Sequence, residues 1–144
     1  MKRLAVVPVL LLLFTAVACS DDSSSDAPDT VAATTGAAGV VLLTPAEGTD
    51  LIGLKGEALT IIDVRTPAEF AEGHLEGAVN ADVQGGQFSA FLAGLDKGAA
   101  YVVYCRSGNR SAVAAQAMID AGFTEVYDLG GIVDLQAAGY SVVQ

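Results

Sequence analysis

From residue 40 onward, short apolar runs alternate with segments whose apolar residues recur at helical spacing, and this alternation constrains the fold most strongly. Five short strands are predicted, in the runs VVLL, LTIIDV, GAVNADV, AAYVVY and EVYDL. Because helical segments stand between them, the connections suit parallel crossover units. The sequence therefore predicts a single α/β domain over 40–144, with a central, mostly parallel five-stranded sheet flanked by helices.

The four residues Thr-Pro-Ala-Glu occur twice, at 44–47 and at 66–69. In each copy the threonine suits the N-cap, the proline suits the first helical position, and the glutamate completes a capping box. We expect the first of these helices to run to about Leu54 and the second to end at Gly73. Further helices are expected in QFSAFLAGL, in RSAVAAQAMIDAG and in GGIVDLQAAG.

The first 18 residues have the layout of a signal peptide. Two basic residues, Lys2 and Arg3, precede an apolar stretch over 4–18. That stretch is shorter than the roughly 20 residues of a comfortable membrane span, which disfavours the alternative of an uncleaved anchor. The small residues before Cys19 predict cleavage after Ala18.

The bond between Ala18 and Cys19 also resembles a bacterial lipoprotein cleavage site, although that pattern prefers a larger apolar residue where Ala16 stands. Cys19 is therefore a candidate for lipidation. Residues 19–39 consist mainly of Ser, Asp, Ala, Thr and Gly, and we expect them to form a disordered linker. These features predict an exported domain of the cell envelope, tethered to the membrane by lipid or otherwise periplasmic or secreted.

The charge of the chain excludes some classes of partner. The formal net charge is −10, and two of the seven basic residues lie in the N-terminal segment, so the body is strongly acidic. Such a body should repel nucleic acid and anionic lipid, and an anionic substrate would need a local positive pocket. With two cysteines and one histidine, the sequence predicts no disulfide framework, no metal site and no cofactor.

The loop CRSGNRS follows the apolar run AAYVVY and carries the main chemical signal. Gly108 and Asn109 tolerate positive φ, so successive N–H groups could turn inward and form an anion-binding nest. The dipole of the following helix and the charges of Arg106 and Arg110 would add to that effect. These features favour a thiolate and predict Cys105 as a nucleophile, against the alternative of a small buried residue at a strand end.

Three segments, IDVRTPAEFAEGHLEGAVN, VYCRSGNRSAVAA and VYDLGGIVDLQAAGY, resemble a rhodanese-homology domain of the single-domain sulfurtransferase type over about 40–144. The resemblance implies that Cys105 takes sulfur from a small anionic donor such as thiosulfate. It then passes the sulfur from a persulfide to a thiol or to cyanide. The resemblance also implies a substrate-binding loop made of Arg106, Ser107, Gly108, Asn109, Arg110 and Ser111.

The same resemblance implies structural, non-catalytic roles for other residues. Asp63 and Arg65 would sit beside the loop and organise it, and Arg65 could pair with Glu69 across the helix start. His74 would be structural. The glycines at 130–131 would form a tight turn without a chemical role.

Two other functions stay open. A sulfur carrier or binding module would use the same loop and leave the chemistry to a partner protein. A phosphatase or arsenate-type enzyme is disfavoured, because related cysteine phosphatases have five residues between cysteine and arginine, whereas four separate Cys105 from Arg110. This comparison also comes from the family resemblance.

Overall fold

The structure is a computed structural model that describes residues 39–144. The predicted signal peptide over 1–18, the candidate lipidation site Cys19 and nearly all of the predicted linker lie outside the described residues. Within 39–144, every helix is too short or too polar to cross a membrane.

The centre of the domain is a five-stranded sheet in which every neighbouring pair of strands is parallel. Its strands lie in the order β1-β6-β5-β2-β4. Their bounds are β1 Val41–Leu42, β2 Leu59–Asp63, β4 Val79–Asn80, β5 Ala100–Cys105 and β6 Glu125–Gly131. The predicted α/β fold with a parallel five-stranded sheet is confirmed.

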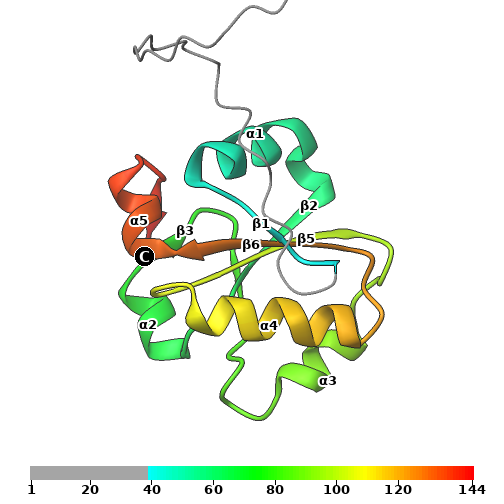
Figure 1. The fold of residues 1–144 in the computed structure, drawn as a ribbon. Helices are drawn as coiled ribbons and strands as arrows, with labels where there is room; N and C mark the ends of the chain where they lie inside the picture. The colour runs from blue at the N-terminus through cyan, green and yellow to red at the C-terminus, as the bar shows by residue number, and fades with distance from the viewer. Residues whose placement is uncertain (1–38) are drawn as a thin grey trace, which may run out of the picture. The chain divides into compact units, whose positions relative to one another are not determined.

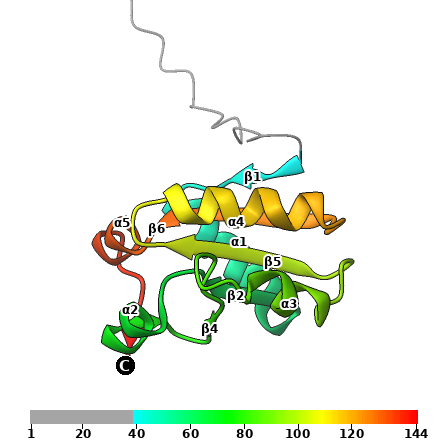
Figure 2. The same ribbon diagram turned by 90° about the horizontal axis from the view of Figure 1, so that it is seen from below.

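Helices cover both faces of this sheet (Figures 1 and 2). Helices α3 and α4 pack on one face, and α1 and α5 pack on the other. The helices are α1 Pro45–Lys55, α2 Pro67–Glu72, α3 Phe88–Ala93, α4 Asn109–Asp120 and α5 Ile132–Ala137, with a 3₁₀ turn, η2, at Gly56–Ala58. The sheet therefore lies in a middle layer, as its apolar strand sequences require.

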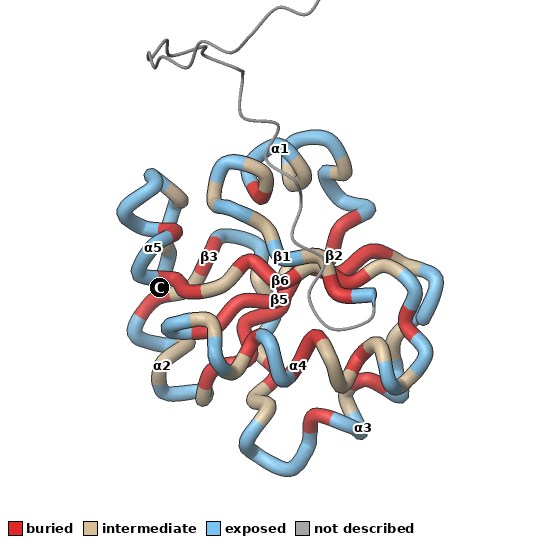
Figure 3. Tube along the Cα trace, in the orientation of Figure 1, coloured by how far each residue is buried: buried red, intermediate tan, exposed pale blue. Residues whose placement is uncertain are grey.

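Strand β5 runs through the middle of the sheet, and all six of its residues are buried (Figure 3). Successive strand residues point to opposite faces. Tyr101, Val103 and Cys105 accordingly join the core beneath α4, whereas Val102 and Tyr104 join the core beneath α1 and α5. This alternation places the Cys105 side chain on the α4 side of the sheet.

Both predicted capping boxes are present. The Thr44 side chain accepts from the Glu47 N–H, and the Glu47 carboxylate accepts from the Thr44 N–H over 2.8 Å. Thr66 and Glu69 make the same reciprocal bonds at the start of α2. Helix α1 ends at Lys55 and α2 ends one residue before Gly73, so both predicted helices are confirmed within one residue.

A second, two-stranded sheet was not predicted. Strand β3, His74–Leu75, pairs antiparallel with β7, Val142–Val143. Each strand has two residues, too few to show an alternating pattern in the sequence. The Leu75 N–H donates to the hydroxyl of Tyr104 over 3.0 Å, which ties the small sheet to the strand that ends at Cys105.

Candidate active site

Cys105 is the last residue of β5 and lies at the carboxyl edge of the parallel sheet. Only 1% of the residue is exposed. The register between β5 and β6 shifts after Val103, and the shift brings Gly131 opposite Cys105. The cysteine thus occupies the edge where parallel sheets place their ligands, as its position after the run AAYVVY predicted.

The loop after Cys105 turns back over its sulfur. Gly108 has a left-handed backbone with φ of 93°, and α4 begins at the next residue. The N–H of Gly108 donates to Sγ of Cys105 over 3.1 Å. The N–H groups of Ser107 and Ser111 also help to lower the pKa of this thiol. Three amides of the predicted nest therefore act on the thiol.

These loop groups shift the pKa of the Cys105 thiol. Burial raises the pKa of the Cys105 thiol, but the N–H groups of Ser111 and Ser107, the Ser111 hydroxyl and the Gly108 N–H together lower it by more. The net effect is a pKa below the ordinary value for a thiol. Because the thiolate is the nucleophilic form, the loop activates this cysteine without a separate base.

The Ser111 side chain stabilises the loop through hydrogen bonds to two backbone carbonyls. It is buried, and its hydroxyl donates to the carbonyl of Gly108 over 2.9 Å. A second, longer contact of 3.4 Å joins the hydroxyl to the Gly130 carbonyl. The side chain of Ser111 therefore holds the loop against β6.

The loop also rests on Gly131, which was predicted only as part of a tight turn. A side chain on Gly131 would place its Cβ 2.8 Å from the Arg106 carbonyl oxygen and 2.9 Å from Cα of Ser107. The turn beneath is held by Asp128, a buried residue whose carboxylate accepts from the Gly130 N–H over 2.9 Å. Neither support was predicted from the sequence, although the run VYDLGG contains the residues that form them.

The two arginines of the loop lie in different surroundings. Arg106 is exposed, as are Ser107 and Asn109. Arg110 forms two parallel hydrogen bonds of 2.7 Å to the two carboxylate oxygens of Glu69 at the start of α2. The predicted pairing of Glu69 with Arg65 is therefore wrong, because Arg110 occupies both oxygens of that carboxylate.

Arg65 pairs with Asp63, two residues away at the end of β2. Asp63 is fully buried and Arg65 is 6% exposed. The guanidinium donates to the Asp63 carboxylate over 2.6 Å and to the carbonyl of Gly73 over 2.6 Å. It also lies 5.9 Å from the centre of the Tyr104 ring. These contacts reach Tyr104, which directly precedes Cys105, and tie the end of β2 to the start of β3.

The His74 side chain contacts Phe70 and none of the residues described above. Its ring stacks on Phe70 with centroids 3.7 Å apart, and Nδ1 lies 3.0 Å from the Phe70 carbonyl oxygen. Among residues 39–144, no three His, Cys, Asp or Glu side chains are grouped so that they could hold a metal ion.

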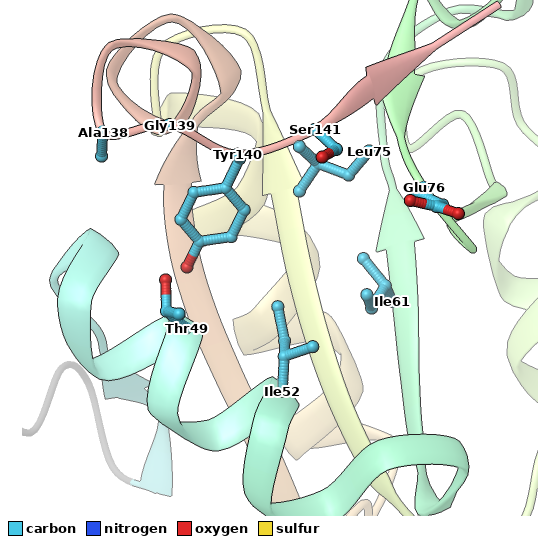
Figure 4. A pocket seen from close by; sticks show the side chains of 9 residues that line it. All are labelled: Thr49, Ile52, Ile61, Leu75, Glu76, Ala138, Gly139, Tyr140 and Ser141. Carbon is cyan, nitrogen blue, oxygen red and sulfur yellow. The ribbon is translucent and has the colours of Figure 1, made fainter.

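A pocket of about 410 Å³ lies between α1 and the segment that leads to β7 (Figure 4). Ile52, Ile61 and Leu75 line its apolar part, and the Thr49 and Tyr140 side chains stand beside them. Several of these residues pack against the core on the α1 side of the sheet. The pocket is therefore separate from the Cys105 sulfur, which faces α4.

Comparison with known proteins agrees with this geometry. The family described as "Rhodanese-like domain" matches residues 44–138, which include the strand ending at Cys105, the loop and the turn beneath it. The chain belongs to the rhodanese-like domain family. Its matched part covers four of the five strands of the main sheet and all five helices.

Curated relatives of this rhodanese-like domain carry the name thiosulfate sulfurtransferase GlpE. The protein from Pseudomonas fluorescens is 37% identical over 82 residues, which are 57% of this chain and 73% of the relative. The protein from Pseudomonas aeruginosa is 36% identical over 87 residues, which are 60% of this chain and 77% of the relative. The domain is thus similar to sulfurtransferases over most of its described length.

Solved structures show the same fold. A rhodanese-related protein from Thermoplasma volcanium matches with a TM-score of 0.59 and 29% identity, over 70% of this chain and 95% of that one. A structure described as rhodanese with anions, from E. coli, matches with a TM-score of 0.51 and 29% identity, over 60% of this chain and 98% of that one.

Proposed function

We propose that this rhodanese-like domain is a sulfurtransferase of the thiosulfate sulfurtransferase type, which moves sulfane sulfur through a persulfide on Cys105. One observation carries the proposal: the loop after Cys105 turns back over its sulfur, and the Gly108 N–H donates to that sulfur over 3.1 Å. The names of the Pseudomonas relatives support the same activity.

The reaction has two displacement steps. The Cys105 thiolate attacks the outer sulfur of the donor, the S–S bond of thiosulfate breaks, and sulfite leaves with the bonding electron pair. The enzyme then holds a persulfide anion, Cys105–S–S⁻. In the second step a thiolate or cyanide attacks the terminal sulfur, and the Cys105 thiolate leaves. Electrons and charge balance in both steps, and no outside oxidant is needed.

The amides around the thiolate have the same task in both steps. The N–H groups of Ser107, Gly108 and Ser111 stabilise negative charge on sulfur, first on the resting thiolate and then on the persulfide. The first turn of the 12-residue helix α4 has no side-chain N-cap, so its dipole and free amides act in the same direction.

The direct test compares the wild-type protein with Cys105→Ser. We expect the wild type to gain the mass of one sulfur atom after thiosulfate treatment and to form thiocyanate when cyanide is added. The variant should do neither while keeping its fold, because Ser differs from Cys by a single atom. Sulfur loading in the variant, or none in the wild type, would refute a Cys105 persulfide.

The burial of Cys105, which is 1% exposed, favours a second candidate function. In that case the domain is a sulfur carrier that only a partner protein unloads. A carrier would accept one sulfur from thiosulfate but would not turn over with free cyanide or small thiols, whereas the proposed enzyme turns over repeatedly. A phosphoester assay should be negative for both candidates, since the loop has four residues between Cys105 and Arg110.

We also propose that the domain works outside the cytoplasm. The support is the signal-peptide pattern over 1–18, the cysteine at position 19 and the polar composition of 19–39. The mass of the mature protein from a cell-envelope fraction tests this. A chain beginning at Cys19, with or without added lipid, is the expected result. A full-length chain found in the cytoplasm would contradict the proposal.

A further inference from the structure

The two identical capping boxes of this chain differ in one contact. Glu47 and Glu69 both close a box on the threonine three residues before them. Only Glu69 also binds an arginine, and that arginine is Arg110 of the Cys105 loop. The residues 66–69 therefore do more than begin a helix, because they connect α2 to the candidate active site.

The Glu69 carboxylate accepts hydrogen bonds from both Arg110 and Thr66. Arg110 Nη1 and Nη2 each donate over 2.7 Å, one to each carboxylate oxygen, which is the strongest geometry for such a pair. Thr66 donates to the same carboxylate from its N–H over 3.2 Å and from its hydroxyl over 3.0 Å. The hydrogen bond from Arg110 is the main reason that the pKa of Glu69 falls to about 2. The carboxylate is thus charged at every pH where the protein would be assayed.

The ion pair of Glu69 and Arg110 lowers the net positive charge of the side chains around the loop. Among residues 39–144, three basic side chains, those of Lys55, Arg65 and Arg110, each form an ion pair with a carboxylate. Within the same range Arg106 forms none. The positive charge of Arg110 is offset by Glu69, so Arg106 is the one arginine of the loop whose charge is not paired with a carboxylate. Both members of the pair are about one-fifth exposed, so a substrate at the loop can sense them.

We propose that Glu69 is a specificity-determining residue that makes this site prefer singly charged sulfane donors to the doubly charged thiosulfate ion. The preferred class is organic thiosulfonates and persulfide anions. This inference rests on the proposed function and concerns the donor of the first step. The site still accepts thiosulfate, but with a lower kcat/KM, because the carboxylate of Glu69 repels the second charge.

The chemistry is the same for the preferred class. A thiosulfonate anion, R–SO₂–S⁻, gives its outer sulfur to the Cys105 thiolate, and the sulfinate R–SO₂⁻ leaves with the bonding electron pair. The persulfide on Cys105 is identical to the one formed from thiosulfate. Any difference between the two donors therefore arises in the binding and transfer of that donor, and the acceptor step is common to both.

The test uses two donors that differ by one charge, thiosulfate and the methanethiosulfonate anion, in which a methyl group replaces one oxygen. The variant is Glu69→Gln, because glutamine also serves in a capping box and keeps the helix start. We expect Glu69→Gln to raise kcat/KM for thiosulfate about five- to tenfold relative to methanethiosulfonate, the size expected for one unit charge a few ångströms away.

Two controls separate charge from structure. Glu47→Gln makes the same change in the other capping box, where no arginine is bound, and should leave the donor ratio unchanged. Adding Arg110→Gln to Glu69→Gln should remove the gain for thiosulfate, because the gain depends on the freed guanidinium. Unfolding temperatures of all variants check that the fold is kept.

The outcomes distinguish this inference from the proposed function. If Glu69→Gln changes kcat/KM for both donors by the same factor, Glu69 only positions the loop and the inference is overturned. If the ratio falls, the charge acts in the opposite direction and the inference is also overturned. If Cys105 takes sulfur from neither donor in the wild type, the proposed function fails and this inference fails with it.

Discussion

At the scale of single residues, the ionisation of Cys105 depends on a competition between burial and hydrogen bonding. Burial disfavours the thiolate, and the amides of Ser107, Gly108 and Ser111, with the Ser111 hydroxyl, favour it by more. The sequence suggested that Arg106 would share this work. Arg106 is exposed, and the groups that lower the pKa of Cys105 are the loop amides and the Ser111 hydroxyl.

The first prediction concerns the titration of this thiol. Thiolate absorbance near 240 nm should appear below the ordinary thiol pKa of about 8.5, because the folded state lowers the pKa of Cys105. The Cys105→Ser variant provides the baseline and subtracts any signal from Cys19. A transition at or above the ordinary value would contradict the amide ring as the source of activation.

The same shift predicts how stability depends on pH. A lowered folded-state pKa means that the thiolate stabilises the native protein fully above the unfolded pKa. This contribution is lost as the pH falls through the folded pKa. The difference in unfolding free energy between wild type and Cys105→Ser should therefore grow as the pH rises through this window. A difference that shrinks with rising pH would have the wrong sign.

The second prediction concerns Gly131. Gly131→Ala should destabilise the protein by about 1–3 kcal/mol, the usual cost of overpacking, since the new Cβ would lie 2.8 Å from the Arg106 carbonyl oxygen. The displaced loop should also slow sulfur transfer. Gly53→Ala is a suitable control, because it lies in a helix with nothing within 4 Å of the new Cβ. Equal stability and activity in the two variants would show that the loop does not rest on Gly131.

At the scale of elements, helix α4 begins in an unusual way. Its N-cap, Gly108, provides no side-chain acceptor for the first turn. The Gly108 N–H donates to the Cys105 sulfur over 3.1 Å, and the Ser111 N–H in the first turn helps to lower the pKa of that thiol. Negative charge on the sulfur and the start of the helix therefore stabilise each other.

The third prediction compares the two capping boxes. Thr44→Ala and Thr66→Ala should each cost about 1 kcal/mol of stability, the typical effect of losing an N-cap side chain. Only Thr66→Ala should alter sulfur transfer, because it removes a hydrogen bond that holds Glu69 beside Arg110. Unfolding by denaturant and thiosulfate kinetics measure the two effects. An equal change of activity in Thr44→Ala would show that general stability, and not the α2 contact, is responsible.

At the scale of the whole molecule, the buried pair of Asp63 and Arg65 joins the two sheets. Arg65 binds the last residue of β2 and the carbonyl of Gly73, immediately before β3. Asn80 adds hydrogen bonds from its side-chain amide to the carbonyls of Asp63 and Arg65. The pair is thus part of the framework that fixes Tyr104, and its link to the Cys105 loop is indirect.

The fourth prediction follows from the burial of this pair. Asp63→Asn should destabilise the domain by about 3–5 kcal/mol, because it leaves the Arg65 guanidinium buried without a compensating charge. Asp50→Asn, at an exposed position of α1, should change stability little. Denaturant unfolding of both variants measures the difference. A loss below about 1 kcal/mol in Asp63→Asn would mean that the pair does not hold the two sheets together.

The sequence alone determined the features that depend on residues close together in the chain. A capping box needs residues three apart, a buried strand needs one apolar run, and the amide ring needs Gly108 beside a helix start. The helix starts at Pro45 and Pro67, the strand ending at Cys105 and the parallel sheet were predicted for this reason. Each of these signals is local, so no knowledge of the folded chain was required.

Which distant groups meet depends on the folded chain and could not be read from local sequence. Glu69 could have paired with Arg65, which is close in sequence, or with Arg110, which is 41 residues away. In the folded chain Glu69 pairs with Arg110, and Arg65 pairs with Asp63. Gly131 meets Arg106 because the register between β5 and β6 shifts beside Cys105. Composition and spacing limit which charges can pair, but the choice among them depends on where the folded backbone places each side chain.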